Sequence, residues 1–203
     1  MESGWACHRQ AVDPEAVAAA LDDLAALRTA HGIGHASHLV AAPAGWPHTD
    51  RLGAGLAALA AAMLGAPVAC FAATYVVKPA GVGMPTRWHQ DAPAWAARLE
   101  GRPAATVWLA LTDADEANGC LEVVPGSHLG PLLPLEAHGG EPSIFGVASV
   151  GPLPGPPEAL PATAGDAIVV DARLLHAAGP NRSAGDRVAL ALRYTTGLPV
   201  VAG

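Results

Sequence analysis

The chain has 203 residues, of which 51% are hydrophobic and 14% are charged, and its formal net charge is −7. This length suits a single domain, which we expect to span 1–203. The acidic balance, without any cluster of lysine and arginine, argues against nucleic acid and against an anionic membrane surface as partners. We therefore expect a small-molecule substrate, and the sequence carries no signal for an oligomeric state.

The cysteines and the N-terminus favour a cytoplasmic protein. No CxxC pair and no apolar signal segment occur, and three cysteines lie far apart, at Cys7, Cys70 and Cys120. The uncharged stretch over 52–77 is rich in alanine and is interrupted by Gly65 and Pro67. A membrane span would need bulky apolar residues throughout, so we expect a helix followed by a buried strand instead.

The first part of the chain is predicted to be helical. Asp13 followed by Pro14 is typical of an N-cap with proline at the first helical position, and apolar residues then recur at helical spacing until Gly32. A second helix is expected from about Asp50 to a Gly-Ala-Pro stop. We expect residues 1–66 to form a helical flank.

From residue 67 onward the pattern changes to short strands separated by turns. The dipeptide Asn118-Gly119 is a strong hairpin signal. Helices followed by short strands predict a β-sandwich or barrel with helices packed outside it, with the β core over 67–198. The expected strands are VACFAATYVV (68–77), ATVWLAL (105–111), CLEVV (120–124), AIVV (167–170) and RVALALRYTT (187–196).

Two further segments are expected to be loops that shape the substrate side of a site. One is the proline- and glycine-rich region from Leu129 to Pro161, which shows little periodicity. The other runs from Pro93 to Arg102 and contains Trp95.

The segment HGIGHASH places His31, His35 and His38 at helical spacing. Gly32 and Gly34 make a continuous helix costly there, and no carboxylate or cysteine partner is near in sequence. We expect a loop near the mouth of the active site rather than a second metal site.

The stretch TRWHQD holds the strongest candidate for metal binding. In an extended chain His89 and Asp91 point to the same face, about 6.5 Å apart along the strand. His176, which follows an apolar strand, is the best candidate for a third ligand. Two histidines and one carboxylate form the facial triad of non-haem iron(II) oxygenases, which leaves the opposite face of the metal open.

Arg187 strengthens this interpretation. It lies eleven residues after His176, at the start of a strand whose same face also carries Ala189, Ala191 and Arg193. Small neighbours leave room for a guanidinium, whose planar fork suits a dicarboxylate ligand. The alternative for Arg187 is a surface salt bridge to Asp186 or Glu122.

Three segments of this chain resemble the phytanoyl-CoA dioxygenase family of Fe(II)/2-oxoglutarate oxygenases, and they occur in the order in which the family has them. The similarity runs from about Thr74 to Thr196, more than half of the chain, and implies a double-stranded β-helix, or jelly roll, with flanking helices. The segments are WHQD, TVWLALTDADEANGCLEVVPGSH and LLHAAGPNRSAGDRVALALRY.

The resemblance implies a role for each matching residue. His89, Asp91 and His176 match the iron ligands, and Arg187 matches the arginine that pairs with the distal carboxylate of 2-oxoglutarate. Related halogenases lack the carboxylate ligand, so Asp91 indicates a hydroxylase rather than a halogenase. Fe(II) is the implied cofactor, with 2-oxoglutarate and O2 as cosubstrates.

Other matched positions carry weaker implications. Trp108 falls where relatives contact the cosubstrate, although core packing is an equal alternative, and Thr74 is expected to face the same pocket. Relatives often carry a cosubstrate-binding serine two residues after the distal histidine, where this chain has Ala178. Ser127 and His128 are expected mainly to maintain the fold.

The predicted activity is oxidation of a C–H bond in a small molecule, such as an intermediate of secondary metabolism. No basic cluster suggests a site for the phosphates of coenzyme A, so the family name does not predict the substrate. Two alternatives stay open: a cupin-like metal-dependent hydrolase or isomerase, which has no use for Arg187, and a non-catalytic jelly-roll binding protein. The second predicts that the triad side chains lie more than about 8 Å apart, beyond the reach of one metal ion.

Overall fold

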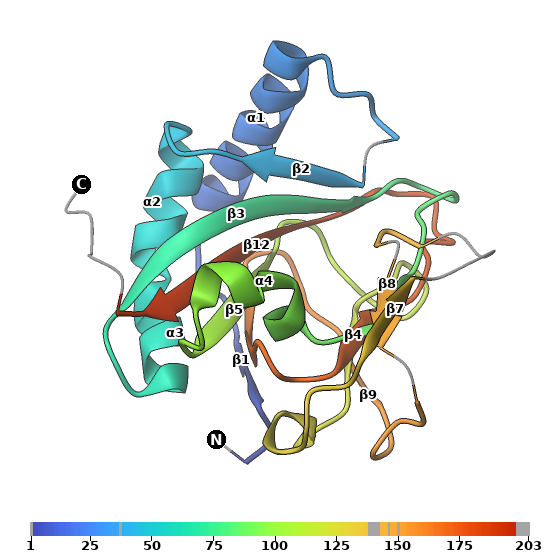
Figure 1. The fold of residues 1–203 in the computed structure, drawn as a ribbon. Helices are drawn as coiled ribbons and strands as arrows, with labels where there is room; N and C mark the ends of the chain where they lie inside the picture. The colour runs from blue at the N-terminus through green and yellow to red at the C-terminus, as the bar shows by residue number, and fades with distance from the viewer. Residues whose placement is uncertain (1, 37, 138–142, 146, 150, 198–203) are drawn as a thin grey trace.

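The computed structural model describes the chain except for residues 1, 37, 138–142, 146, 150 and 198–203 (Figure 1). Its helices are α1 (Pro14–His31), α2 (Pro47–Gly55), α3 (Ala57–Leu64) and α4 (Asp91–Leu99), with a 3-10 turn at Ser127–Leu129. Its strands are β1 (Trp5–His8), β2 (Leu39–Ala42), β3 (Val68–Lys78), β4 (Thr86–His89), β5 (Ala104–Ala110), β6 (Leu121–Val123), β7 (Leu135–Ala137), β8 (Val147–Ser149), β9 (Glu158–Leu160), β10 (Ala167–Asp171), β11 (His176–Ala178) and β12 (Arg187–Thr196).

The described strands form a major sheet, a minor sheet and a small hairpin, all antiparallel. The major sheet has the order β1-β10-β5-β12-β3-β2, the minor sheet has the order β4-β11-β6-β9, and β7 pairs with β8. The predicted jelly roll is confirmed. In Figure 1 the helices α1, α2 and α3 lie beside the major sheet, and the minor sheet lies away from them.

The alternation along β12 determines which face meets the helices. Val188, Leu190, Leu192 and Tyr194 are buried in the larger apolar core, together with side chains of α1, α2 and α3. The hydroxyl of Tyr194 donates to the backbone oxygen of Gly53 over 2.9 Å. The opposite face of β12 is therefore turned toward the minor sheet.

The first helix begins and ends at the predicted residues. Asp13 accepts a hydrogen bond from the Ala16 amide, and Gly32 closes the helix with φ 62°. The second predicted helix begins earlier, at Pro47, and is two short helices instead of one, because Leu56 leaves regular helical geometry with φ −92° and ψ 0°.

The flank expected to be helical over 1–66 also supplies two strands of the major sheet. Strand β1 pairs with β10, and β2 pairs with β3, so both sheet edges come from this part of the chain. These four-residue strands have too few positions for a recognisable periodicity.

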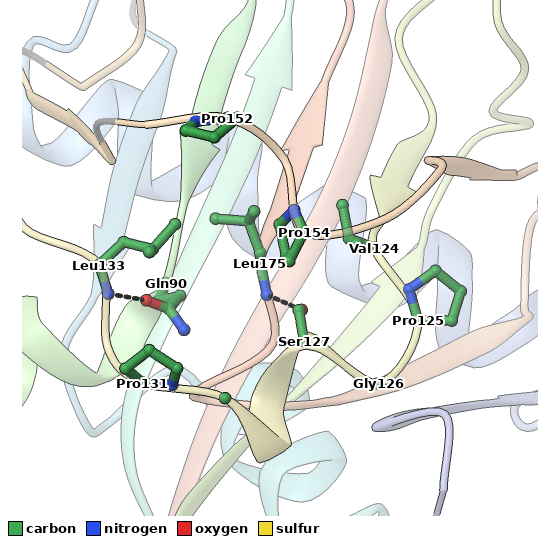
Figure 2. A pocket seen from close by; sticks show the side chains of 11 residues that line it. Gln90, Val124, Pro125, Gly126, Ser127, Pro131, Leu133, Pro152, Pro154 and Leu175 are labelled. Atoms are coloured by element: carbon green, nitrogen blue, oxygen red, sulfur yellow. Dashed lines mark hydrogen bonds between the residues drawn. The ribbon is translucent and has the colours of Figure 1, made fainter.

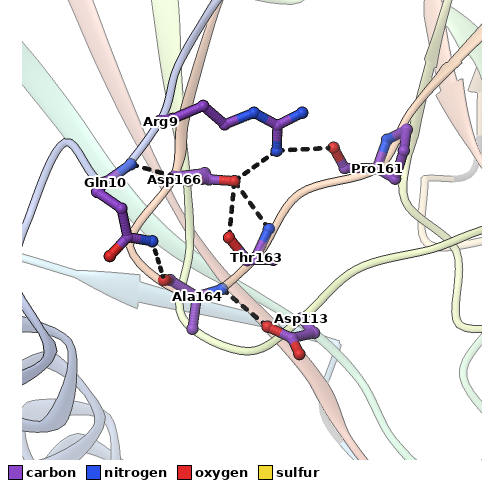
Figure 3. Close-up of polar contacts among 7 residues, drawn as sticks. All are labelled: Arg9, Gln10, Asp113, Pro161, Thr163, Ala164 and Asp166. Carbon is purple, nitrogen blue, oxygen red and sulfur yellow. Dashed lines mark hydrogen bonds and ion pairs between the residues drawn. The ribbon is translucent and has the colours of Figure 1, made fainter.

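Asp166 anchors the edge strand β1 (Figure 3). Its buried carboxylate accepts hydrogen bonds from Arg9 Nη1, from the Gln10 amide, and from the amide and hydroxyl of Thr163. Burial alone would raise the pKa of Asp166, but these bonds lower it to about 2. The N-terminal segment is thus tied to the loop that precedes β10.

Three expectations about turns and loops need correction. Asn118-Gly119 does form a turn, but β5 and β6 belong to different sheets, so it makes no hairpin between them. The segment 129–161 contains β7, β8 and β9, apart from its undescribed residues 138–142, 146 and 150. The segment 93–102 is mostly the helix α4, since Asp91 begins a helix immediately after the extended HxD stretch.

Candidate metal centre

The structure brings His89, Asp91 and His176 together. His89 ends β4, and His176 begins β11 directly opposite it in the minor sheet. Gln90 is extended, with φ −116° and ψ 137°, so Asp91 at the start of α4 returns to the same face as His89. The three candidate ligand atoms lie within 4.8 Å of one another, and His89 Nε2 is 3.6 Å from Asp91 Oδ1.

Both imidazoles are oriented by backbone carbonyls. His89 Nδ1 lies 2.8 Å from the oxygen of Arg87, and His176 Nδ1 lies 2.9 Å from the oxygen of Leu174. A carbonyl only accepts, so each Nδ1 carries the proton and each Nε2 offers a lone pair. Hydrogen bonds of this kind set the tautomer of metal-binding histidines.

Burial and neighbouring side chains shift the pKa values of His176 and Asp91. Burial lowers the pKa of His176 to about 4, so this imidazole is neutral near pH 7. Burial would raise the pKa of Asp91, but the neighbouring side chains of His89, His176 and Arg193 hold it well below its usual range. Neutral imidazole and ionised carboxylate are the forms that bind a metal.

Thr106, which the sequence analysis did not select, positions Asp91. Its hydroxyl donates to Asp91 Oδ2 over 2.9 Å from β5 in the major sheet. This bond leaves Oδ1 facing His89. The only sequence signal for it was a polar residue inside an otherwise apolar strand.

We expect Thr106→Val to weaken Fe(II) binding by about 10- to 100-fold, because removal of an outer hydrogen bond frees the ligand carboxylate to rotate. Valine keeps the shape, so the thermal midpoint without metal should change little. Metal titration of the purified variant checks this. Thr195→Val is the matched control: it removes a buried threonine's bond to Pro103 O, on the same sheet but outside the triad. Equal losses in both variants would contradict the positioning role.

Arg187 is the other predicted residue with an unusual environment. It is 1% exposed, its Nη1 donates to the Val76 oxygen over 3.4 Å, and its buried Nε has no hydrogen-bond partner. Burial lowers its pKa to about 10. Among described residues it forms no ion pair, and at 1% exposed it is not on the surface, so the alternative of a surface salt bridge to Asp186 or Glu122 is wrong.

Trp108 and Thr74 lie on the same face of the major sheet as Arg187. Both are aligned with Ala191 of β12, one from each neighbouring strand. The Trp108 ring centroid is 5.5 Å from Arg187 Cζ, and Trp108 also packs in the smaller apolar core. Thr74 Oγ1 accepts a hydrogen bond from Arg193. Ala189 and Ala191 have small side chains, so they leave space between these larger ones.

Lys78 is a second cation beside Arg187 that the sequence did not reveal. It is fully buried and aligned with Arg187 across β3 and β12. Its Nζ donates to the oxygens of Met84, Ala178 and Gly179. Burial and the charge of Arg187 lower its pKa to about 7. Lys78 therefore holds the backbone at the position where relatives carry serine.

The NGC and GSH parts of the family motif NGCLEVVPGSH contact the residues that flank β11. A Cβ on Gly119, whose φ is 84°, would collide with the Gly179 oxygen, so glycine is needed there. Ser127 Oγ accepts from the Leu175 amide, next to His176 (Figure 2). Leu175 and Gln90 face away from the triad and line a separate cavity of about 300 Å³.

The HGIGHASH segment does not assemble a metal site among the described residues, where the triad is the only such cluster. His38 Nε2 accepts from the Met84 amide, and His35 lies near Arg28 and Asp186. The described part of the chain also contains no helix with the length and hydropathy that a membrane crossing requires.

Fold and site together define a jelly-roll protein with a buried cluster of two histidines and one carboxylate. It also has a buried arginine, Arg187, whose Nε has no hydrogen-bond partner among the described residues. The family profile "Phytanoyl-CoA dioxygenase (PhyH)" matches residues 1–189. The chain therefore belongs to the phytanoyl-CoA dioxygenase family, as its sequence motifs predicted.

Relatives and solved structures agree with this assignment. The peroxisomal phytanoyl-CoA dioxygenase of Rattus norvegicus is 35% identical over 91 residues, which cover 43% of this chain and 27% of the rat protein. The chain spans less than half the length of each of four curated relatives.

Two solved structures match over the whole chain. EvdO2 from Micromonospora carbonacea var. aurantiaca, complexed with 2-oxoglutarate, is 26% identical with a TM-score of 0.78, covering 100% of this chain and 90% of that one. The epimerase SnoN, in complex with Fe3+, alpha ketoglutarate and nogalamycin RO, is 26% identical with a TM-score of 0.74, covering 100% and 88%.

Proposed function

We propose that the protein is an Fe(II)- and 2-oxoglutarate-dependent oxygenase that oxidises a C–H bond of a small molecule in secondary metabolism. One observation carries this proposal. The ligand atoms of a buried triad lie within 4.8 Å of one another between the two sheets, and the inner face of the major sheet also carries Arg187, whose buried Nε has no hydrogen-bond partner among the described residues. Iron binding needs the first feature, and a dicarboxylate cosubstrate needs the second.

The donor set fits iron. His89 Nε2, Asp91 and His176 Nε2 would occupy one face of the metal, and imidazole with carboxylate is the ligand set of non-haem Fe(II) oxygenases. When bound, iron and 2-oxoglutarate supply the oxidising chemistry through dioxygen. The two carbonyl-bound Nδ1 atoms and the Thr106 hydroxyl keep the ligand atoms aimed at one point.

Arg187 would anchor the distal carboxylate of 2-oxoglutarate. Leaving a guanidinium buried without a counter-charge costs roughly several kcal/mol, so a site that retains one is suited to an anionic ligand. Trp108 packs close to the guanidinium and limits its movement. With Ala178 in place of the usual serine, Lys78 fixes the strand that serine would occupy by donating to the Ala178 and Gly179 oxygens.

Within this class, Asp91 favours oxygenation over halogenation, because a carboxylate fills the position that halide would take. Epimerisation is a second candidate, favoured by the similarity to SnoN over the whole chain. Both outcomes begin with removal of hydrogen from a positioned C–H bond, so the same ligand set serves either. The location predicted from the cysteines, a reducing cytoplasm, stays a prediction.

The structure bears on the two alternatives. The binding-protein alternative predicted triad separations above about 8 Å, whereas the ligand atoms lie within 4.8 Å. A cupin-like hydrolase or isomerase would accept the triad but gives no reason for an unpaired cation at Arg187.

The test is the formation of the ternary complex and its turnover. Anaerobic addition of Fe(II) and then 2-oxoglutarate should produce the visible charge-transfer band of the chelate. In air with ascorbate, the protein should release succinate, faster with some members of a panel of secondary metabolites. A product that gains one oxygen atom indicates hydroxylation, and one of unchanged mass indicates epimerisation. Iron-loaded protein without band or succinate would favour the cupin-like alternative.

A further inference from the structure

A second buried arginine lies on the same face of β12 as Arg187. Arg193 is six residues further along the strand, which places it about 20 Å away along β12. It is 8% exposed and aligned with Thr106, the residue that holds Asp91. Arg187 lies level with Lys78, which holds Ala178. The triad therefore lies between the two arginines.

The guanidinium of Arg193 is held in place from one side only. Both of its hydrogen bonds to described residues go through Nη1, to Thr74 Oγ1 over 3.1 Å and to the Ala191 oxygen over 3.5 Å. The Trp95 ring covers its plane, with the ring centroid 5.1 Å from Cζ, and Phe71 packs edge-on against Trp95. The cation is thus oriented rather than mobile.

The other edge of this guanidinium makes no hydrogen bond to a described residue. Buried Nε makes no hydrogen bond, and no carboxylate in the described ranges pairs with Arg193. Nε and Nη2 share one edge, and that edge matches the two oxygens of a carboxylate. Asp91 offsets the charge only through space, and a metal ion on Asp91 would cancel that contribution. An anionic ligand would restore the balance.

We propose that Arg193, with Thr74 and Trp95 beside it, binds a second carboxylate group on the Asp91 side of the metal site. This inference rests on the proposed function, because it assigns the ligand chemistry of that same site. A carboxylate there has two sources: the primary substrate, or the metal-binding end of 2-oxoglutarate. The half-buried rings of Trp95 and Phe71, which pack against each other, favour an apolar body attached to the carboxylate.

The experiment compares a matched pair of ligands by calorimetry. Protein loaded with Mn(II), a redox-stable substitute for Fe(II), is titrated with 3-phenylpropanoate and with its uncharged amide. We expect the wild type to bind the carboxylate at least tenfold more tightly than the amide. Arg193→Met should abolish this preference, and Arg193→Lys should keep part of it because the charge remains. A second titration with 2-oxoglutarate is run on the same proteins.

The two titrations separate the sources. Loss of the carboxylate preference with unchanged 2-oxoglutarate affinity in Arg193→Met assigns the site to the primary substrate. A tenfold or greater loss of 2-oxoglutarate affinity in that variant assigns it to the cosubstrate. If neither quantity changes, or if the wild type shows no preference and Arg193→Met binds 2-oxoglutarate normally, the inference is overturned.

Two controls complete the design. Arg98→Met makes the same change at an exposed arginine of α4 that also contacts Phe71, and it should alter neither titration. Failure of wild-type, metal-loaded protein to bind 2-oxoglutarate contradicts the proposed function, while the pair of phenylpropanoate ligands still tests Arg193 by itself.

Discussion

Replacing Asp91 with alanine should lower 2-oxoglutarate turnover more than about 100-fold, with a matching loss of bound iron. Loss of an outer-shell partner alone costs about 10- to 100-fold in metal affinity, and Asp91 would be a direct ligand. It is also the only anionic member of the triad, so its removal leaves two neutral imidazoles near the charge of Arg193. Metal analysis of the purified variant and succinate release measure the two losses.

The control for Asp91→Ala is Asp22→Ala, which removes an exposed carboxylate on α1. Both variants should keep the thermal midpoint of the metal-free protein within a few degrees. The wild type and the control should be stabilised by added Fe(II), and Asp91→Ala should not. Normal iron content and turnover in Asp91→Ala would show that the metal site lies elsewhere or does not serve the reaction.

Replacing Arg187 with methionine should raise the 2-oxoglutarate concentration needed for half-saturation by roughly 100-fold or more, because truncating one side of a buried charged hydrogen bond costs about 2–5 kcal/mol. Iron binding should persist, since Arg187 does not contact the triad. Titration of the charge-transfer band gives the affinity directly. The 2-oxoglutarate affinity of Arg187→Lys should lie between those of the wild type and Arg187→Met, because an ammonium keeps the charge and loses the planar fork.

Stability provides an independent check on Arg187. The guanidinium is buried with one weak hydrogen bond and no ion pair to a described residue, so an apolar side chain of similar length should leave the cosubstrate-free protein as stable or more so. Added 2-oxoglutarate should raise the thermal midpoint of the iron-loaded wild type and not that of Arg187→Met. Arg182→Met, at an exposed position in the preceding loop, should behave as wild type. A destabilised variant with normal 2-oxoglutarate affinity would indicate a structural role.

Local patterns predicted the parts of the fold that depend on one segment. The N-cap at Asp13 and the stop at Gly32 define α1 by themselves, because capping acts within one helical turn. The alternation in β12 assigned Arg187 and Arg193 to one face for a similar reason, since successive side chains of a strand point to opposite sides. The HxD spacing placed His89 and Asp91 on one face for the same reason, because Gln90 between them is extended.

Patterns that depend on a distant partner were missed or misjudged. Asn118-Gly119 gave a correct turn and an incorrect hairpin, because a turn signal does not specify which sheet the next strand joins. Strands β1 and β2 are too short to show a period and are held by pairing with β10 and β3. The helix α4 was missed because Asp91 and Pro93 follow an extended stretch without a strong cap.

The sequence by itself determined which residue types are available for the chemistry: two histidines and a carboxylate at ligand spacing, an arginine in a strand of small residues, and the motifs of the family. Only the tertiary structure decided what surrounds them. Thr106, Lys78 and Arg193 reach the site because β5, β3 and β12 are neighbours in one sheet at one register. Register is set by the packing of whole faces, and a shift of one residue would turn each of these side chains away from the metal.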